Sequence, residues 1–262
     1  LEAKLASLEG AESAIASASG MAAVSASLLA HLKAGDHLVI ADDLFIISQL
    51  LFAEDFPTRG IEVTPVAITD LDAVRAAMRP NTRVIYAEVL SNPWMRVSDI
   101  PALAKIAHAS KALLVIDNTF LSPAVVRPLE LGADLVLHAT TKWLAGHGDA
   151  IGGVVSGAKA LVDPIRRQTD LLGQAASPFN SWLISRGART LSLRIERASA
   201  NAAKLAALLE AHPKVEWVRH PSLASHPDRD VADAVLRGSW GAMLAFKPRA
   251  ADGVDPLDAM RA

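Results

Sequence analysis

The 262-residue sequence contains no cysteine, which excludes disulfide bonds, thiolate metal sites and cysteine nucleophiles. This composition fits a reducing compartment, and we expect a cytoplasmic protein. No charge sign dominates, because 26 Lys and Arg residues stand against 28 Asp and Glu residues, for a net charge of −2. The sequence therefore predicts no nucleic-acid partner. No apolar run approaches the roughly 20 residues that cross a bilayer, so we expect no membrane partner either.

What the chain does contain is an alternation of short apolar runs and helical patterns. The near-continuous hydrophobicity of the runs indicates strands buried on both faces, as in a parallel sheet. Strand followed by helix, repeated, predicts an α/β fold with a mostly parallel, doubly wound sheet. The expected strands are 37–41, 61–66, 83–89, 112–117, 134–139 and 152–157, and the expected helices are 21–33, 71–78, 100–109 and 158–172.

Both ends of the chain look like parts of helices. Leu1, Leu5 and Leu8 fall on one helical face, and residues 255–262 read like the start of another helix. We therefore expect a fragment of a longer protein.

The last third of the chain predicts a second domain. A long helix is expected from Pro178, capped by Ser177 and interrupted near Gly187. Strand-like runs follow at 215–221 and 241–248. We predict a large domain at 1–211 and an incomplete, smaller α+β domain at 212–262.

Gly20 and Met21 open a helix directly after Ser19. Backbone N–H groups at the positive end of a helix form a ready anion site, suited to phosphate. An ordinary cap beside a glycine turn is the alternative interpretation.

Three polar residues follow expected strands. Asp117 ends the most hydrophobic run, where a carboxylate needs a cation or strong donors. Glu88 ends another run, and Asn92 lies in the turn before Pro93. Capping of the next helix or turn by Asp117, and simple turn chemistry for the other two, remain alternatives.

The stretch HATTKWLAGHGDAIGG, residues 138–153, places Lys142 just after an apolar run. Most lysines in loops are solvated. A lysine at a buried strand end can instead form a Schiff base with a carbonyl, and Thr141 beside it is a hydroxyl donor suited to an anion. His147 and Asp149 lack a cluster of partner ligands, so no metal site is predicted. The five tryptophans, Trp143 among them, are interpreted as packing residues.

A strand-end lysine, a strand-end aspartate and a helix-start anion cradle together match what pyridoxal 5′-phosphate (PLP) requires. The lysine would hold the cofactor covalently, the aspartate would keep its ring nitrogen protonated, and the helix start would bind its phosphate.

The chain resembles the Cys/Met-metabolism family of PLP enzymes, which includes cystathionine γ-synthase, cystathionine lyases, methionine γ-lyase and the O-acyl-homoserine sulfhydrylases. The resemblance runs through LEAKLASLEGAESAIASASGMAA, SNPWMRVSDIPALAKIAH, VIDNTFLSP, the lysine block, SPFNSWLISRGARTLSLR and GAMLAF. It implies the fold-type I transferase architecture and a homotetramer built as a dimer of dimers.

The resemblance also implies roles for individual residues. Lys142 would bind PLP covalently and then move protons, and Asp117 would pair with the pyridinium nitrogen. The remaining implied cofactor contacts are phosphate-binding amides of Gly20 and Met21, a phosphate hydroxyl of Thr141, a ring-oxygen hydrogen bond from Asn92, ring stacking by Phe45, and positions near the cofactor for Glu88 and Thr119.

The implied activity is γ- or β-elimination or replacement on an amino acid with an activated side chain, such as cystathionine, methionine or an O-acyl-homoserine. Another fold-type I activity, such as transamination, and a catalytically weak member acting as a subunit remain alternatives. The family pattern is broken at Phe45, where most members have tyrosine, and at Ala139, where they have serine. By the same resemblance, we expect the family's N-terminal arm and the C-terminal arginine that binds the substrate carboxylate to lie outside these 262 residues.

Overall fold

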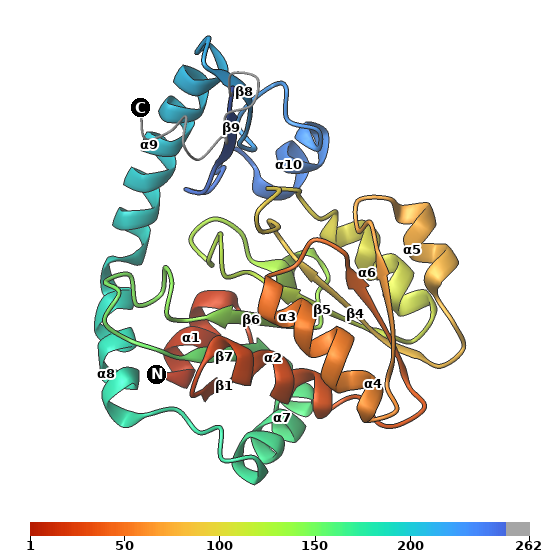
Figure 1. The fold of residues 1–262 in the computed structure, drawn as a ribbon. Coiled ribbons are helices and arrows are strands. Elements are labelled where there is room, and N and C mark those ends of the chain that lie inside the picture. The colour runs from red at the N-terminus through yellow and green to blue at the C-terminus, as the bar shows by residue number, and fades with distance from the viewer. Residues whose placement is uncertain (250–262) are drawn as a thin grey trace.

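A seven-stranded sheet forms the centre of the computed structural model, which describes residues 1–249 (Figure 1). Its strands lie in the order β1-β7-β6-β5-β4-β2-β3, and a separate two-stranded sheet pairs β8 with β9. The strands are β1 (Ser13–Ser17), β2 (His37–Ala41), β3 (Glu62–Val66), β4 (Thr82–Glu88), β5 (Leu113–Asp117), β6 (Leu135–Ala139), β7 (Gly153–Gly157), β8 (Val215–Arg219) and β9 (Ala245–Pro248).

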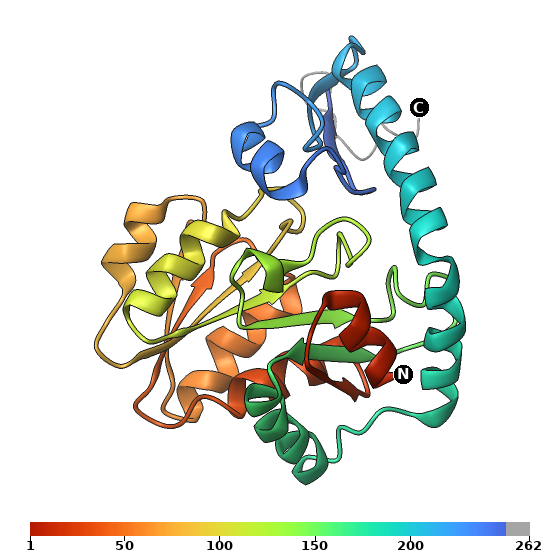
Figure 2. The same cartoon turned by 180° about the vertical axis from the view of Figure 1, so that it is seen from behind.

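Helices lie on both faces of the large sheet, with α2 and α3 on one side and α6 on the other (Figures 1 and 2). The predicted doubly wound α/β fold is therefore confirmed. The helices are α1 (Glu2–Glu9), α2 (Gly20–Leu29), α3 (Ile46–Leu50), α4 (Phe56–Thr58), α5 (Leu71–Ala77), α6 (Ile100–Ala109), α7 (Lys159–Leu171), α8 (Pro178–Gly187), α9 (Leu191–Glu210) and α10 (Arg229–Leu236). No helix within residues 1–249 has the length and apolarity needed to cross a membrane.

Sequence and structure differ in two places. The strand β1 was not predicted; it pairs antiparallel with β7, which in turn is antiparallel to β6. One edge of the sheet is thus not parallel. The second difference is the helical segment from α3 to α4, which includes a π-helical turn at Leu51–Asp55 and begins without a side-chain cap.

The expected interruption of the long helix near Gly187 is confirmed. The helix α8 ends at Gly187, a short 3₁₀ turn covers Ala188–Thr190, and α9 continues from Leu191. Figure 1 shows this run passing along one end of the large sheet toward β8 and β9. The division at residues 211 and 212 stays a prediction, and the helix-like segment at 255–262 lies outside the described residues.

The carboxyl ends of the central strands β4, β5 and β6 lie side by side at one end of the sheet. These strands are parallel, and Glu88 of β4 is the register partner of Asp117 of β5. Ala139 ends β6 beside them, and Lys142 follows three residues later. Ligands of open α/β sheets bind at the carboxyl ends of the strands, so the fold places these residues where a site is expected.

Candidate functional site

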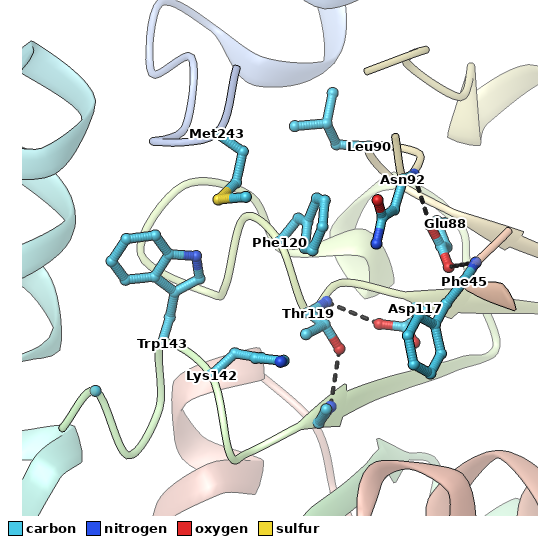
Figure 3. Close-up of a pocket in the computed structure, with 12 residues that line it drawn as sticks. Phe45, Glu88, Leu90, Asn92, Asp117, Thr119, Phe120, Lys142, Trp143 and Met243 are labelled. Carbon is cyan, nitrogen blue, oxygen red and sulfur yellow. Dashed lines mark hydrogen bonds between the residues drawn. The ribbon is translucent and has the colours of Figure 1, made fainter. Parts of the chain in front are cut away.

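A cavity of about 540 Å³ opens at the carboxyl ends of β4, β5 and β6. Figure 3 shows side chains from the large sheet on one side and a segment before β9 on the other. The lining residues are Phe45, Glu88, Leu90, Asn92, Asp117, Thr119, Phe120, Ala139, Lys142, Trp143, Gly146 and Met243. Six of the nine predicted cofactor residues therefore lie around one cavity.

Lys142 lies in a tight turn directly after β6. Its backbone N–H donates to the carbonyl of Ala139 at 3.1 Å, and its own carbonyl accepts from the N–H of Gly146 at 2.8 Å. The side chain is exposed and extends into the cavity toward Thr119 (Figure 3). The turn thus presents a primary amine to whatever occupies the cavity.

Asp117 occupies the wall beyond Thr119. Its Oδ1 accepts from the backbone N–H of Thr119 at 2.8 Å, and the hydroxyl of Tyr86 lies 3.5 Å from Oδ2. Burial raises the pKa of Asp117 above its ordinary value, although the hydrogen bonds from Thr119 oppose this effect. The turn chemistry considered from the sequence is present, yet the carboxylate forms no salt bridge within residues 1–249 and suits a positively charged ligand.

Glu88 holds two backbone segments at the rim of the cavity. Its two carboxylate oxygens accept from the N–H of Phe45 at 2.8 Å and from the N–H of Asn92 at 3.2 Å. Burial, followed by the charge of Asp117, raises its pKa well above the ordinary value. Glu88 therefore fixes the positions of Phe45 and Asn92.

The side chains of Phe45 and Asn92 line the cavity. Asp117 lines it too, and Figure 3 shows the Asn92 amide pointing inward. The hydroxyl of Thr119 accepts from the N–H of Ala139 at 2.8 Å, which ties the end of β6 to the loop after β5. An aromatic ring, an amide and an acid thus surround the space in front of the amine.

Three predicted phosphate contacts do not line the cavity. Gly20 and Met21 begin α2, whose Ser19 cap accepts from the N–H of Ala22 at 3.1 Å. The Thr141 hydroxyl exchanges hydrogen bonds with the backbone of Gly152 at 3.2 and 3.4 Å. Their roles toward a phosphate stay predictions.

Gly20 nevertheless lies close to the cavity wall. A Cβ built on Gly20 would lie 2.6 Å from the Cβ of Ala139, which is far below van der Waals contact. Only glycine allows the start of α2 to approach the end of β6 so closely. The helix start therefore lies next to a residue that does line the cavity.

Sequence reasoning missed five lining residues: Leu90, Phe120, Trp143, Gly146 and Met243. Trp143 was interpreted as packing only, but it forms a wall beside Lys142. Met243 comes from the segment before β9, so the smaller sheet's region contributes to the site. The only available clue was adjacency: Phe120 and Trp143 each follow a predicted site residue.

The side chains around the cavity fit PLP. A lysine amine faces the space, the half-buried carboxylate of Asp117, whose pKa is raised, can hold a cationic ring nitrogen, and Phe45 offers an aromatic face. Within residues 1–249, no three His, Asp or Glu side chains gather closely enough to hold a metal ion.

Comparison with known proteins agrees with this geometry. The family model described as "Cys/Met metabolism PLP-dependent enzyme" matches residues 1–257. A canavanine gamma-lyase of Pseudomonas canavaninivorans is 45% identical over 94% of this chain and 62% of its own length. An L-methionine gamma-lyase of Pseudomonas putida is 44% identical over the same shares.

A solved structure is also similar. The crystal structure of cystathionine gamma-lyase from Lactobacillus plantarum, complexed with L-serine, superposes with a TM-score of 0.93 at 38% identity. It covers 98% of this chain, and the match spans 66% of that protein. The chain thus spans less than two thirds of the length of these three relatives.

Proposed function

Because the chain belongs to the Cys/Met metabolism family of PLP-dependent enzymes, we propose that it forms the catalytic core of a PLP-dependent lyase or transferase. The reaction is γ- or β-elimination or replacement on an amino acid with an activated side chain. The observation that carries this proposal is that Lys142, Asp117 and Asn92 line one cavity. A subunit without catalytic function has no need for an amine and a buried acid in the same cavity.

The residues of the chain divide the work by position. Lys142 would hold the cofactor covalently, and its Nζ would take the α-proton of the substrate and return protons to it. Asp117 would keep the ring nitrogen protonated through its half-buried carboxylate. PLP, when bound, supplies an electron-withdrawing ring that stabilises the negative charge left at the α-carbon.

Other side chains orient and shield the reacting groups. Phe45 would stack on the ring and Asn92 would donate to the ring oxygen. Glu88 holds both residues in place through their backbone N–H groups. Thr119 contributes its contact with Asp117. Gly20, Met21 and Thr141 would bind the phosphate. The start of α2 lies next to Ala139, which lines the cavity.

The relatives narrow the substrate to amino acids with a leaving group on the γ-carbon. Their names refer to canavanine, methionine and cystathionine, which carry a γ-oxygen or γ-sulfur substituent. The walls formed by Phe45, Phe120, Trp143 and Met243 are apolar, which favours an uncharged thioether substituent such as that of methionine. We also propose a homotetramer and a cytoplasmic location, as the family resemblance implies.

Profiling the products of the PLP-loaded protein with a panel of amino acids tests the proposal. Elimination gives an α-keto acid together with ammonia and the released side-chain fragment, whereas transamination converts the cofactor to pyridoxamine 5′-phosphate without ammonia. We expect the first pattern with methionine or cystathionine. Pyridoxamine 5′-phosphate as the main product would contradict the proposed reaction.

Cofactor attachment is tested separately from turnover. Reduction of the PLP-loaded protein with borohydride, followed by peptide mass analysis, is expected to find the label on Lys142 and to lose it in Lys142→Ala. The variant Lys111→Ala, which changes a lysine of a distant turn, is the matched control and keeps the label. Labelling elsewhere in the wild type would refute the assignment.

A further inference from the structure

Arg194 of α9 reaches across to the turn that carries Lys142. Its Nη1 donates to the carbonyl of Trp143 at 2.8 Å, and its Nη2 donates to the carbonyl of Gly187 at 3.0 Å. Its Nε donates to the hydroxyl of Thr190 at 3.0 Å. One guanidinium therefore joins the residue after Lys142 to the junction between α8 and α9.

Two glycines make room for this arrangement. A Cβ built on Gly146 would lie 2.0 Å from Nη1 of Arg194, and one built on Gly187 would lie 1.9 Å from the carbonyl oxygen of Ala145. Gly146 also has a φ of +77°, a conformation that favours glycine. The guanidinium and the helix junction both pack directly against the backbone of the lysine turn.

The guanidinium is bound by backbone and hydroxyl oxygens rather than by an acid. No carboxylate among residues 1–249 forms a salt bridge with Arg194, and burial lowers the pKa of Arg194 from its ordinary value. Three hydrogen bonds to neutral oxygens therefore hold the guanidinium in place without an opposite charge. Its two Nη groups form a rigid fork that donates to two backbone carbonyls, those of Trp143 and Gly187, and so fixes the distance between them.

We propose that Arg194 is a positioning residue that holds the turn of Lys142 so that Nζ faces the bound cofactor. This rests on the proposed role of Lys142 as the PLP-binding lysine. Because Gly146 closes the turn through its hydrogen bond to the Lys142 carbonyl, fixing Trp143 and Gly146 fixes the backbone from which the lysine extends. Loss of the fork leaves the cavity intact and allows the amine to move away from the aldehyde.

Two ligands separate this role from general damage to the site. PLP needs an aligned Lys142 for its covalent bond, whereas pyridoxamine 5′-phosphate has no aldehyde and reports only non-covalent binding. In Arg194→Met we expect the apparent affinity for PLP to fall by about tenfold or more, since a charge-assisted hydrogen bond is lost. The affinity for pyridoxamine 5′-phosphate is expected to stay within about twofold of wild type.

The conservative variant and a control on the same helix complete the design. Arg194→Lys keeps the charge but not the fork, and we expect it to restore PLP attachment only in part. Arg197→Met removes an exposed arginine of α9 and is expected to match wild type for both ligands. Borohydride labelling of Lys142 at limiting PLP provides a second reading of the same difference.

An equal loss of affinity for PLP and for pyridoxamine 5′-phosphate in Arg194→Met would overturn the inference, because it would indicate collapse of the cavity. Unchanged binding of both would overturn it as well. If wild-type protein binds PLP but carries no label at Lys142, the proposed function itself fails and this inference fails with it. Selective loss of PLP attachment, with labelled wild type, supports both.

Discussion

Glu88 and Asp117 are register partners at the ends of β4 and β5; Glu88 is buried and Asp117 is half-buried. Burial raises the pKa of each, and the charge of Asp117 raises that of Glu88 further. Two adjacent carboxyl groups do not easily ionise at the same time. A cationic ring nitrogen in the cavity would stabilise the ionised form. The pair therefore links cofactor binding to the pH dependence of stability.

Replacing Asp117 with asparagine is expected to flatten the pH dependence of the apoprotein. A carboxyl with a raised folded pKa binds more protons in the folded state, so the free energy of unfolding falls as pH rises from about 4 through the folded pKa. Asp117→Asn removes one such group and lowers the pKa of Glu88. Denaturant unfolding from pH 4 to 8 measures the difference.

The same variant is expected to lose PLP affinity although its apoprotein is relatively more stable at neutral pH. Asp149→Asn changes an exposed carboxyl of the lysine loop and serves as the control, with both properties unchanged. A variant that kept full PLP affinity would contradict the role of Asp117 at the ring nitrogen.

Restoring a phenol at position 45 is expected to raise turnover. The Phe45 ring lines the cavity but offers no proton donor, and a positioned general acid contributes about 10²–10⁴-fold in many enzymes. We expect Phe45→Tyr to increase ammonia release from methionine or an O-acyl-homoserine by at least roughly tenfold. Ile46→Thr, at an exposed neighbour outside the cavity, is expected to leave the rate unchanged. Equal rates in wild type and Phe45→Tyr would show that the phenol is dispensable here.

A hydroxyl at position 139 is expected to strengthen phosphate binding. Ala139 lines the cavity and lies against Gly20 at the start of α2. A serine there adds a donor where the phosphate is proposed to bind, and a hydrogen bond to a charged group stabilises by about 1.5–3 kcal/mol. The dissociation constant of PLP is expected to fall about tenfold in Ala139→Ser, measured by absorbance titration. Ala139→Val adds bulk without a donor, and a matching gain in that variant would exclude the hydrogen-bond explanation.

The sequence predicted the parallel part of the sheet because those strands are continuous apolar runs with polar residues at their carboxyl ends. Glu88, Asp117 and Lys142 could be found for the same reason, since each follows such a run. The strand β1 was missed because SAIAS consists of small residues without a strong β pattern. Its pairing with β7 is decided by tertiary contacts that no local pattern contains.

Lining residues from distant segments were missed for a different physical reason. Met243 reaches the cavity only because α9 carries the chain past the end of the large sheet, and Arg194 meets Trp143 only because Gly146 and Gly187 permit close approach. Such contacts depend on how helices pack against turns. The periodicity of a single segment cannot predict them.

The ion pair between Arg96 and Asp228 joins the loop after β4 to the segment before α10. Both Nε and Nη2 of Arg96 donate to the Asp228 carboxylate at 2.7 Å, and the N–H of Val97 donates to it at 3.0 Å. Burial alone would raise the pKa of Asp228, but the hydrogen bonds from Arg96 and Val97 outweigh burial and lower it. The pair contributes stability that is present above about pH 4 and is lost as pH falls through the folded pKa.

Arg96→Ala is therefore expected to destabilise the protein by about 3 kcal/mol at pH 7, because it leaves Asp228 buried without its cation. The loss of stability on acidification should also become shallower than in wild type. Arg75→Ala, which breaks an exposed pair with Asp72, is expected to cost less than about 1 kcal/mol. Denaturant unfolding at pH 7 and pH 4 measures both effects. If Arg96→Ala and Arg75→Ala lowered the free energy of unfolding equally, burial of Asp228 would not decide the strength of its ion pair with Arg96.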